Sequence, residues 1–358
     1  MKLSELGWSE FFDVALAQSR GKGLTPGRVV SEHRGVLRVA TEKREWRARP
    51  AGRLRREAVG RGDLPAVGDW VLLEAPANAD IALVQQVLPR RTKFSRRAAG
   101  ERNEEQVLAA NIDLVWIAAS IAGEVNLRSI ERYLSIAWES GAQPVVVLTK
   151  ADLAADAVAA VSAVESISPG IPVVAVSSVS GEGIAALGDL LTPGTSIAIL
   201  GPSGVGKSSL INRIAGEELM KVGDVREDDQ RGRHTTTHRQ LLRMPSGALI
   251  IDTPGIREIQ LWETEEGIEE TFSEIEIAAR HCRFSDCRHE TEPGCGVRDA
   301  LARGELDTKR VASFRKLQSE IEFQEQKHDP RVRAEAKRRI REIMRAFRKP
   351  DKLRDRRK

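Results

Sequence analysis

One stretch of the chain carries the residue types that hold a nucleoside triphosphate. Residues 197–211 read Ile-Ala-Ile-Leu-Gly-Pro-Ser-Gly-Val-Gly-Lys-Ser-Ser-Leu-Ile, and Gly201 to Ser208 fit the pattern G-x-x-x-x-G-K-S/T. In such a loop backbone N–H groups turn onto phosphate oxygens, Lys207 adds positive charge at the β and γ phosphates, and the Ser208 hydroxyl ligates Mg²⁺. The alternative is a chance glycine-rich turn, but the apolar run before it and the helical pattern after it favour a phosphate-binding loop.

Two further segments have the side chains that a guanine base requires. Thr149-Lys-Ala-Asp152 follows an apolar run, and the Asp152 carboxylate can accept hydrogen bonds from the ring N–H and the exocyclic amine of guanine, a pair that adenine does not offer. We expect the stem of Lys150 to pack along the base, and Ser177 and Ser178 to support it from the other side. The predicted GTP-binding residues are Thr149, Lys150, Ala151, Asp152, Ser177, Ser178, Gly201, Pro202, Ser203, Gly204, Val205, Gly206, Lys207, Ser208, Ser209, Thr236, Asp252 and Gly255.

Another apolar run ends in Asp252-Thr-Pro-Gly255, which has the groups needed on the magnesium side. We expect the Asp252 carboxylate to reach Mg²⁺ through a water molecule and the Gly255 N–H to meet the γ phosphate. Thr236, or a neighbouring Thr, is expected to close on Mg²⁺ only when GTP is bound. The predicted magnesium ligands are Ser208, Thr236 and Asp252.

All three cysteines of the chain lie between residues 282 and 295, which argues against a disulfide framework. With one histidine they form the pattern C-x4-C-x-H-x5-C, and its four members are Cys282, Cys287, His289 and Cys295. Three thiolates and one imidazole suit tetrahedral Zn²⁺ and leave no open position, so we predict a structural zinc that staples a small subdomain. The alternatives are unpaired buried cysteines, or His281 as the imidazole ligand.

The elements that must position the nucleotide-binding residues are strands and helices in alternation. Near-continuous apolar runs are typical of strands buried on both faces of a parallel sheet, and segments such as 127–140 and 151–167 between them have helical spacing. The runs are 112–120, 144–149, 172–176, 197–200 and 248–252. This alternation predicts a doubly wound α/β domain with its chemistry at the strand ends.

Residues 27–97 have a different pattern, with short alternating segments between Gly and Pro residues. The segments are 27–30, 36–40, 45–49, 69–74 and 82–88. They predict a small β-barrel or sandwich. The Arg-rich strands and the run Arg90–Arg97 suit an oligonucleotide-binding barrel, and the alternative is a barrel that only packs on its neighbour. Residues 1–25 predict a short amphipathic helix.

Charge is unevenly distributed along the 358 residues. The net charge is only +4, but residues 1–100 have 19 Lys and Arg against 11 Asp and Glu, and residues 327–358 have 15 against 5. Basic ends are typical of a polyanion partner such as nucleic acid, and a solvated charged surface is the alternative. With no membrane-length apolar run and no signal peptide, we expect a cytoplasmic protein without a membrane partner. We also expect a monomer.

The order of the motifs resembles one particular group of GTPases. In most GTPases the phosphate loop comes before the base-reading motif, whereas here residues 149–152 precede residues 201–208 and residues 252–255 come last. A compact domain tolerates such a circular permutation because its termini can be relocated at surface loops. With the barrel before this region and the cysteine cluster after it, the chain resembles the circularly permuted GTPases that depend on the small ribosomal subunit.

This resemblance implies a fold and a function. The implied fold is an α/β P-loop GTPase, circularly permuted, with an N-terminal OB-type β-barrel and a C-terminal α-helical zinc-binding domain, divided as 1–100, 101–270 and 271–358. The implied activity is hydrolysis of GTP to GDP and phosphate, stimulated by the 30S ribosomal subunit late in its maturation. The implied partners are the 30S subunit, its 16S rRNA and GTP or GDP. The implied cofactors are one structural Zn²⁺ and Mg²⁺ with GTP.

Several positions depart from GTPases in general. Thr149 stands where Asn is commoner, so a hydrogen bond that braces the phosphate loop is expected to be weaker. Gly204 stands where potassium-dependent relatives carry Asn, so we infer no potassium ligand. Ile256 occupies the place of the water-positioning Gln of Ras-like enzymes, so the intrinsic rate should be low. His234 is then the candidate catalytic residue that orients the attacking water, with a structural or RNA-contact role as the alternative.

Two other functions stay open. An RNA-binding assembly scaffold, in which the nucleotide only fixes the shape of the protein, is compatible with the missing Gln. An ATP-driven RNA remodeller is disfavoured by Asp152. The basic tail from Lys327 to Lys358 is interpreted either as an amphipathic helix that lies on rRNA or as a solvated segment.

Overall fold

The chain folds as two compact units, Met1–Ser273 and Glu274–Lys358. The computed structural model describes residues 2–19, 23–33, 35–75, 79–97, 105–220, 239–252 and 265–328. Among these residues, none of the helices combines the length and the apolar character that a membrane crossing requires. The division into three domains predicted above stays a prediction.

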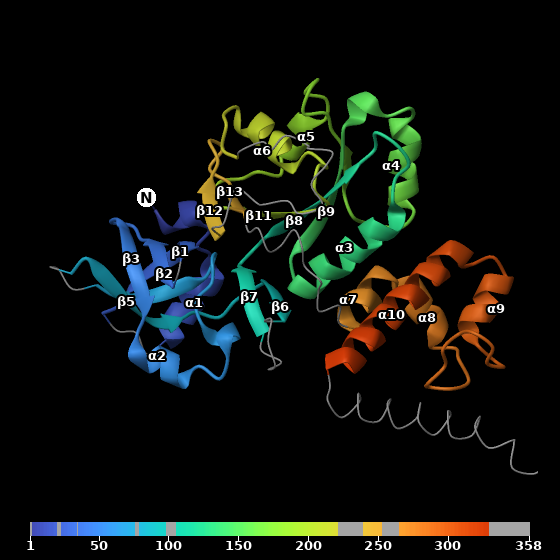
Figure 1. Ribbon diagram of the computed structural model, residues 1–358, viewed down its shortest axis with the longest axis horizontal. Coiled ribbons are helices and arrows are strands. Elements are labelled where there is room, and N and C mark those ends of the chain that lie inside the picture. Colours follow the sequence, from blue (N-terminus) through green and yellow to red (C-terminus); the bar gives the residue numbers. More distant parts are fainter. Residues whose placement is uncertain are drawn as a thin grey trace, which may run out of the picture. The chain divides into compact units, whose positions relative to one another are not determined.

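One continuous eleven-stranded sheet runs through the described part of the first unit (Figure 1). Its order is β10-β9-β8-β11-β13-β12-β1-β2-β3-β5-β4. The strands are β1 (Thr25–His33), β2 (Val36–Ala40), β3 (Glu45–Pro50), β4 (Trp70–Glu74), β5 (Ile81–Val87), β8 (Leu114–Ser120), β9 (Gln143–Thr149), β10 (Val173–Ala175), β11 (Ser196–Leu200), β12 (Arg239–Arg243) and β13 (Leu249–Asp252). From β10 to β13 neighbouring strands are parallel, whereas β12 is antiparallel to β13 and β1 is antiparallel to β12.

The first five strands close into a barrel because β1 pairs with β4 as well as with β2. The inward side chains form an apolar core that includes Val29, Val39 and Val71. The segments η1 (Leu3–Leu6) and α1 (Glu10–Gln18) contribute Leu6 and Phe12 to a second cluster with Trp70. Between β3 and β4 lie α2 (Gly52–Glu57) and η2 (Arg61–Asp63). The predicted barrel is therefore confirmed, with strand bounds within two or three residues of those predicted.

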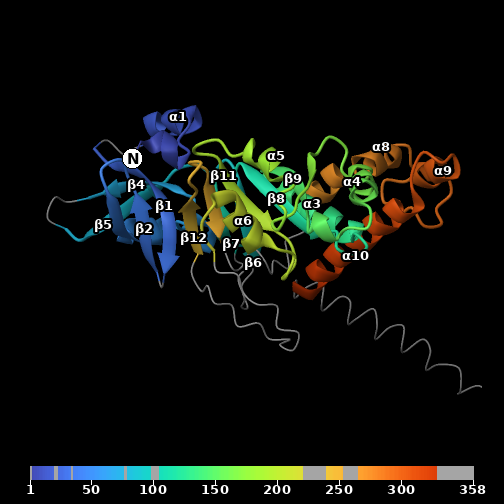
Figure 2. The same cartoon turned by 90° about the horizontal axis from the view of Figure 1, so that it is seen from above.

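The parallel part of the sheet has helices on both faces (Figures 1 and 2). These helices are α3 (Leu127–Ser140), α4 (Ala157–Glu165), α5 (Ile184–Gly188) and α6 (Lys207–Ala215). Because side chains alternate along a strand, Ile117 of β8 belongs to the core cluster that contains α3 residues, and Trp116 belongs to the cluster that contains α6 residues. The predicted doubly wound arrangement is thus present. A last helix of this unit, α7 (Glu265–Thr271), lies against α3.

The predicted helix over residues 151–167 is split in two. A short turn, η3 (Ala151–Leu153), precedes α4, and the Asp156 carboxylate accepts a hydrogen bond from the Ala159 N–H at 2.9 Å. Asp156 therefore begins a new helix as its N-cap, which a periodicity of apolar residues alone does not reveal.

Within the described residues, three strands lie outside the sequence prediction. They are β6 (Lys93–Arg97), β7 (Glu105–Ala110) and β12, and β6 pairs with β7 as a two-stranded sheet.

Two arginines of the basic run 90–97 form ion pairs inside the unit. The Arg90 guanidinium donates from Nε and Nη2 to both oxygens of buried Asp69 at 2.7 Å each, and Arg91 pairs with Asp113. Burial alone would lower the pKa of Arg90, but the hydrogen bond and the charge of Asp69 outweigh burial and raise that pKa. These two arginines are structural.

The second unit is helical in its described part. It contains α8 (Ser273–Ala279, which begins one residue before the unit boundary), α9 (Gly296–Ala302) and α10 (Thr308–His328). Its buried apolar side chains are Ile275, Ala278, Val297, Ala300, Val311, Phe314, Leu317 and Ile321. Arg310 of α10 donates to Glu274 of α8 at 2.6 Å. The loop 280–295 between α8 and α9 has no regular secondary structure and carries the cysteine cluster.

Candidate functional site

The phosphate loop joins the end of β11 to the start of α6. Gly201 has a φ of +140°, and a Cβ atom there would lie 2.4 Å from the Ala118 carbonyl oxygen, so only glycine fits. At the other end Gly206, with a φ of +101°, precedes the helix without a side-chain cap in the described structure. The loop therefore leads directly into a helix N-terminus, a position that favours an anion. Lys207 Nζ donates to the carbonyls of Gly201 and Pro202 at 2.7 and 2.6 Å.

Thr149 connects the base-reading segment to this loop. It is the last residue of β9, it is buried, and its Oγ1 lies 2.6 Å from the Val205 carbonyl oxygen and 3.2 Å from the Ala119 carbonyl oxygen. A hydroxyl has one proton, so the shorter contact is the stronger hydrogen bond. The side chain that replaces the commoner Asn thus still reaches the phosphate loop.

Asp152 and Ser177 are held together beside it. Lys150 has a left-handed backbone, with φ +61°, which turns the chain into η3 and leaves Asp152 exposed. The Ser177 hydroxyl donates to Asp152 Oδ1 at 2.5 Å and accepts from the N–H groups of Val179 and Ser180 at 3.2 and 3.0 Å. Since Ser177 is fully buried, it fixes one carboxylate oxygen and leaves the other side of the carboxylate open to a ligand.

The predicted nucleotide segments that follow strands β9, β10 and β11 share one edge of the sheet with the end of β13, because these strands are parallel. Asp252 is the last residue of β13 and is 7% exposed. Ser208 and Ser209 lie in the first turn of α6. The predicted residues His234, Thr236, Gly255 and Ile256 lie outside the described residues, so their positions stay predictions.

The cysteine cluster in the second unit has the geometry of a tetrahedral metal site. Cys282 Sγ and Cys295 Sγ lie 3.9 Å apart and each lies 3.5 Å from His289 Nδ1, while all four ligand atoms, Cys287 included, lie within 4.8 Å of one another. With Zn–S of about 2.3 Å and Zn–N of about 2.0 Å, a tetrahedron requires about 3.8 Å between sulfurs and about 3.5 Å between sulfur and nitrogen. The residues therefore fit zinc, and the cluster contains His289 rather than His281.

The surroundings of the cluster hold its ligands in place. Burial and the nearby Arg315 guanidinium lower the pKa of His289, which keeps the imidazole neutral and its lone pair available. Burial and the neighbouring thiols raise the pKa of Cys287 to about 11. Arg315 of α10 donates to the His289 carbonyl, and Cys295 caps α9 by accepting from the Arg298 N–H at 3.5 Å. Sequence reasoning missed Arg315, because no spacing links α10 to the loop.

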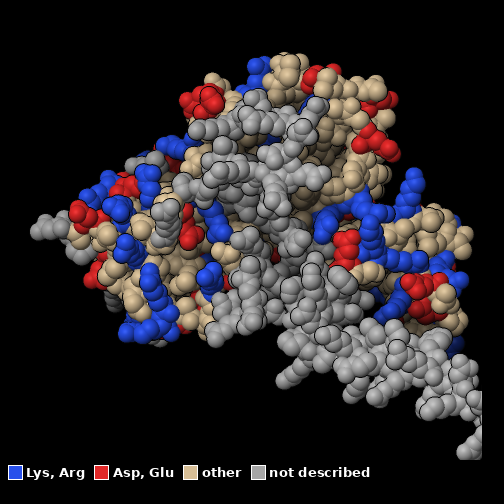
Figure 3. Space-filling model, in the orientation of Figure 1, with Lys and Arg blue, Asp and Glu red and all other residues tan. Residues whose placement is uncertain are grey.

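The outer surface of the barrel carries arginines on two neighbouring strands. Arg38 of β2 and Arg47 of β3 are exposed and lie directly opposite each other, and Arg49 is exposed further along β3. Like charges at opposed positions destabilise a sheet, although Glu45 pairs with Arg38. Figure 3 shows Lys and Arg side chains over this part of the molecule, with acidic residues among them. This face is a candidate nucleic-acid interface.

Most of the comparisons with known proteins agree on one family. A family profile described as RsgA GTPase matches residues 87–262. The chain is 47% identical over 339 residues to the small ribosomal subunit biogenesis GTPase RsgA of Opitutus terrae, covering 92% of each protein, and 43% identical to that of Methanosarcina acetivorans, covering 94% of this chain and 90% of the relative. An ABC transporter profile also matches residues 190–357, a range that contains the phosphate loop.

Two solved structures share the fold. The crystal structure of YjeQ from Thermotoga maritima superposes with a TM-score of 0.64 at 28% identity, over 83% of this chain and 98% of that one. The structure of YloQ, described as a circularly permuted GTPase, superposes with a TM-score of 0.63 at 22% identity, over 86% and 98% of the two chains. The predicted fold class, a permuted GTPase with a barrel before it and a cysteine–histidine cluster after it, is confirmed.

Proposed function

The chain belongs to the RsgA family of small ribosomal subunit biogenesis GTPases, and from this premise we propose that it hydrolyses GTP on the 30S subunit in a ribosome-stimulated reaction late in maturation. One observation supports the GTP-binding part of this proposal most directly: the hydrogen bond from Thr149 to Val205 ties the base-reading segment to the phosphate loop. Both belong to the sheet edge at which Asp252 ends β13. In this proposal guanine and phosphate recognition converge on one nucleotide.

Each residue has a distinct role in this proposal. Asp152, oriented by Ser177, reads the guanine edge. Lys207 leaves its loop carbonyls for the β and γ phosphates, and the N–H groups at the start of α6 bind phosphate oxygens. Ser208 and Asp252, with Thr236, hold Mg²⁺, which when bound neutralises charge between the β and γ phosphates.

The second unit has a structural metal in this proposal. Cys282, Cys287, His289 and Cys295 hold Zn²⁺, supported by the tetrahedral spacing of their ligand atoms. With all four positions taken by protein, the metal fixes the loop 280–295 and has no open position for substrate.

The ribosome is the proposed source of stimulation and of the RNA contact. Isoleucine at position 256 cannot orient water, so turnover is expected to be slow until the 30S subunit orders the groups around the γ phosphate. The exposed arginines of β2 and β3 are the proposed contact with 16S rRNA. A monomer in the cytoplasm stays the expectation.

Phosphate release with and without 30S subunits tests the proposal. We expect slow release alone, a rise of at least ten-fold with 30S subunits, and co-sedimentation with the subunits that is tighter with a slowly hydrolysed GTP analogue than with GDP. Lys207→Ala is the control that removes the phosphate contact. Tight GTP binding without turnover on the subunit would favour the scaffold alternative, and competition by ATP would favour the remodeller.

The role of His234 requires a separate test. His234→Ala is expected to lower ribosome-stimulated turnover about 10²-fold if the imidazole orients water, while the dissociation constant for the GTP analogue stays nearly unchanged. Equal stimulated turnover in the variant and the parent protein would reject the catalytic role and leave a structural or RNA-contact role.

A further inference from the structure

The barrel and the GTP site share a strand ladder. Strand β12 lies between β1 of the barrel and β13, so a single strand separates the barrel from Asp252. The register places Ser31, Gln240 and Asp252 in one row, since Ser31 is opposite Gln240 and Gln240 is opposite Asp252. In the adjacent register position Glu32 is opposite Arg239, and their side chains are 3.6 Å apart, with 34% and 17% exposed.

Strand β12 depends on this neighbour. It has only five residues, and in the described structure its two partners are β13 and β1. Without β1 it would be a short strand at the edge of the sheet, and such strands fray readily. Strand β13, which ends at Asp252, would then have only β11 as a stable neighbour.

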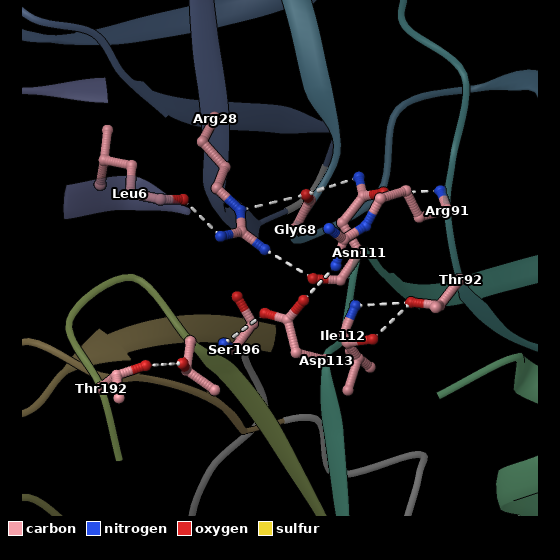
Figure 4. Close-up of polar contacts among 11 residues, drawn as sticks. Leu6, Arg28, Gly68, Arg91, Thr92, Asn111, Ile112, Asp113, Thr192 and Ser196 are labelled. Carbon is pink, nitrogen blue, oxygen red and sulfur yellow. Dashed lines mark hydrogen bonds and ion pairs between the residues drawn. The ribbon is translucent and has the colours of Figure 1, made fainter. Parts of the chain in front are cut away.

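The start of β1 is fixed to the GTPase part as well. Figure 4 shows the Arg28 hub, formed by Leu6, Arg28, Gly68 and Asn111. The buried Arg28 guanidinium donates to the carbonyls of Leu6, Gly68 (3.2 Å) and Asn111 (2.8 Å), and Asn111 Nδ2 donates to the Gly68 carbonyl at 3.1 Å. Asn111 lies three residues before β8, so β1 is attached to the GTPase sheet at both of its ends.

We infer that barrel strand β1 is a structural part of the GTP site, and that Glu32 is a positioning residue that acts through Arg239 and β12 on the Asp252 carboxylate. This inference rests on the proposed role of Asp252 in holding Mg²⁺. Glu32 touches neither the nucleotide nor the metal. Its effect is on how often Asp252 occupies the position from which it reaches the metal through water.

The chain offers a matched control for this position. Glu45 of β3 pairs with Arg38 of β2 across two barrel strands, as Glu32 pairs with Arg239, but neither residue lies on a strand that touches β12. Glu32→Lys and Glu45→Lys therefore both replace one cross-strand ion pair by a repulsion. Only the first acts on the ladder that ends at Asp252. Glu32→Gln is the milder variant if Glu32→Lys fails to fold.

The test measures equilibrium binding of a slowly hydrolysed GTP analogue over a range of Mg²⁺ concentrations, without ribosomes. The half-saturating Mg²⁺ concentration is expected to rise about three-fold in Glu32→Lys, in keeping with the energy of a partly exposed ion pair. It should stay unchanged in Glu45→Lys and return toward the parent value when Glu32→Arg is combined with Arg239→Glu. Analogue binding in the absence of Mg²⁺ should be the same in all of them.

Hydrogen exchange of the peptide 239–252 gives a readout that is independent of nucleotide. Faster exchange in Glu32→Lys than in Glu45→Lys supports the inference, and equal exchange with equal Mg²⁺ dependence overturns it. If the parent protein binds no GTP analogue at all, the proposed function fails, while the exchange comparison still decides whether β1 supports β12.

Discussion

The two units fix their irregular loops by different means. In Met1–Ser273 the phosphate loop rests on packed strands, through the close approach of Gly201 to Ala118 and the hydrogen bond from Thr149. In Glu274–Lys358 the loop 280–295 is held by the four side chains of the cysteine–histidine cluster, and the described part of this unit buries only a small set of apolar side chains. The first unit thus presents its site through packing alone, whereas the second unit is expected to depend on the Zn²⁺ proposed for its cysteine–histidine cluster.

Removing the metal is expected to give the largest difference between the units. A chelator, or Cys282→Ser, should unfold the loop 280–295 and α9, because structural zinc contributes about 10–16 kcal/mol in small domains. Limited proteolysis with mass spectrometry should show cleavage confined to residues 274–328. Binding of the GTP analogue by the first unit should persist. Resistance of the second unit to proteolysis after metal removal would contradict the comparison.

Substitution of Arg28 is expected to destabilise the first unit and leave the second unit unchanged. Arg28→Met removes the guanidinium donor from three buried backbone carbonyls, of which the Gly68 carbonyl keeps a second donor in Asn111 Nδ2, so we expect the free energy of unfolding of the first unit to fall by about 3 kcal/mol. Burial lowers the pKa of Arg28 to about 10, with Asp113 and Asp69 opposing that effect, so the side chain is still charged at neutral pH. Denaturant unfolding measures the loss, and zinc content should not change. Exposed Arg38→Met is the control, and equal stability of the two variants would count against the hub.

Loss of the hydrogen bond between the base-reading segment and the phosphate loop is expected to have a smaller free-energy effect than loss of the Arg28 hub. Thr149→Val keeps the shape but removes the hydroxyl that donates to the Val205 carbonyl, so the dissociation constant for a GTP analogue should rise about ten-fold, or about 1.4 kcal/mol. Thr149→Ser should keep most of the affinity. If Thr149→Val bound the analogue as tightly as the parent protein, this hydrogen bond would have no part in nucleotide binding.

An effect of the same size as that of Thr149→Val is expected at the support of the zinc loop. Arg315→Lys retains the charge but not the planar guanidinium that donates to the His289 carbonyl, so we expect zinc affinity to fall about ten-fold. Competition with a chromophoric chelator measures this. Lys316→Arg, one residue along α10, is the control, and an unchanged affinity in Arg315→Lys would leave that hydrogen bond without a role in metal binding.

Much of the fold could be predicted because its signals are local. Apolar alternation located the barrel strands, the near-continuous runs located β8, β9 and β11, and residue spacing identified the four residues that cluster in the second unit, with His289 among them. Pairings between distant segments could not be predicted. Neither the opposition of Glu32 and Arg239 nor the engagement of Arg90 by Asp69 has a local signature, because each depends on how separate strands come together.

The central claim is that Asp152 and Lys207 serve one guanine nucleotide, and Asp152→Asn tests it most directly. An amide in place of the carboxylate offers a donor, which matches the carbonyl that xanthine has where guanine has its exocyclic amine. We predict that affinity for GTP falls about 10²-fold while xanthosine triphosphate becomes the preferred ligand. Unchanged preference for GTP in Asp152→Asn would contradict the account.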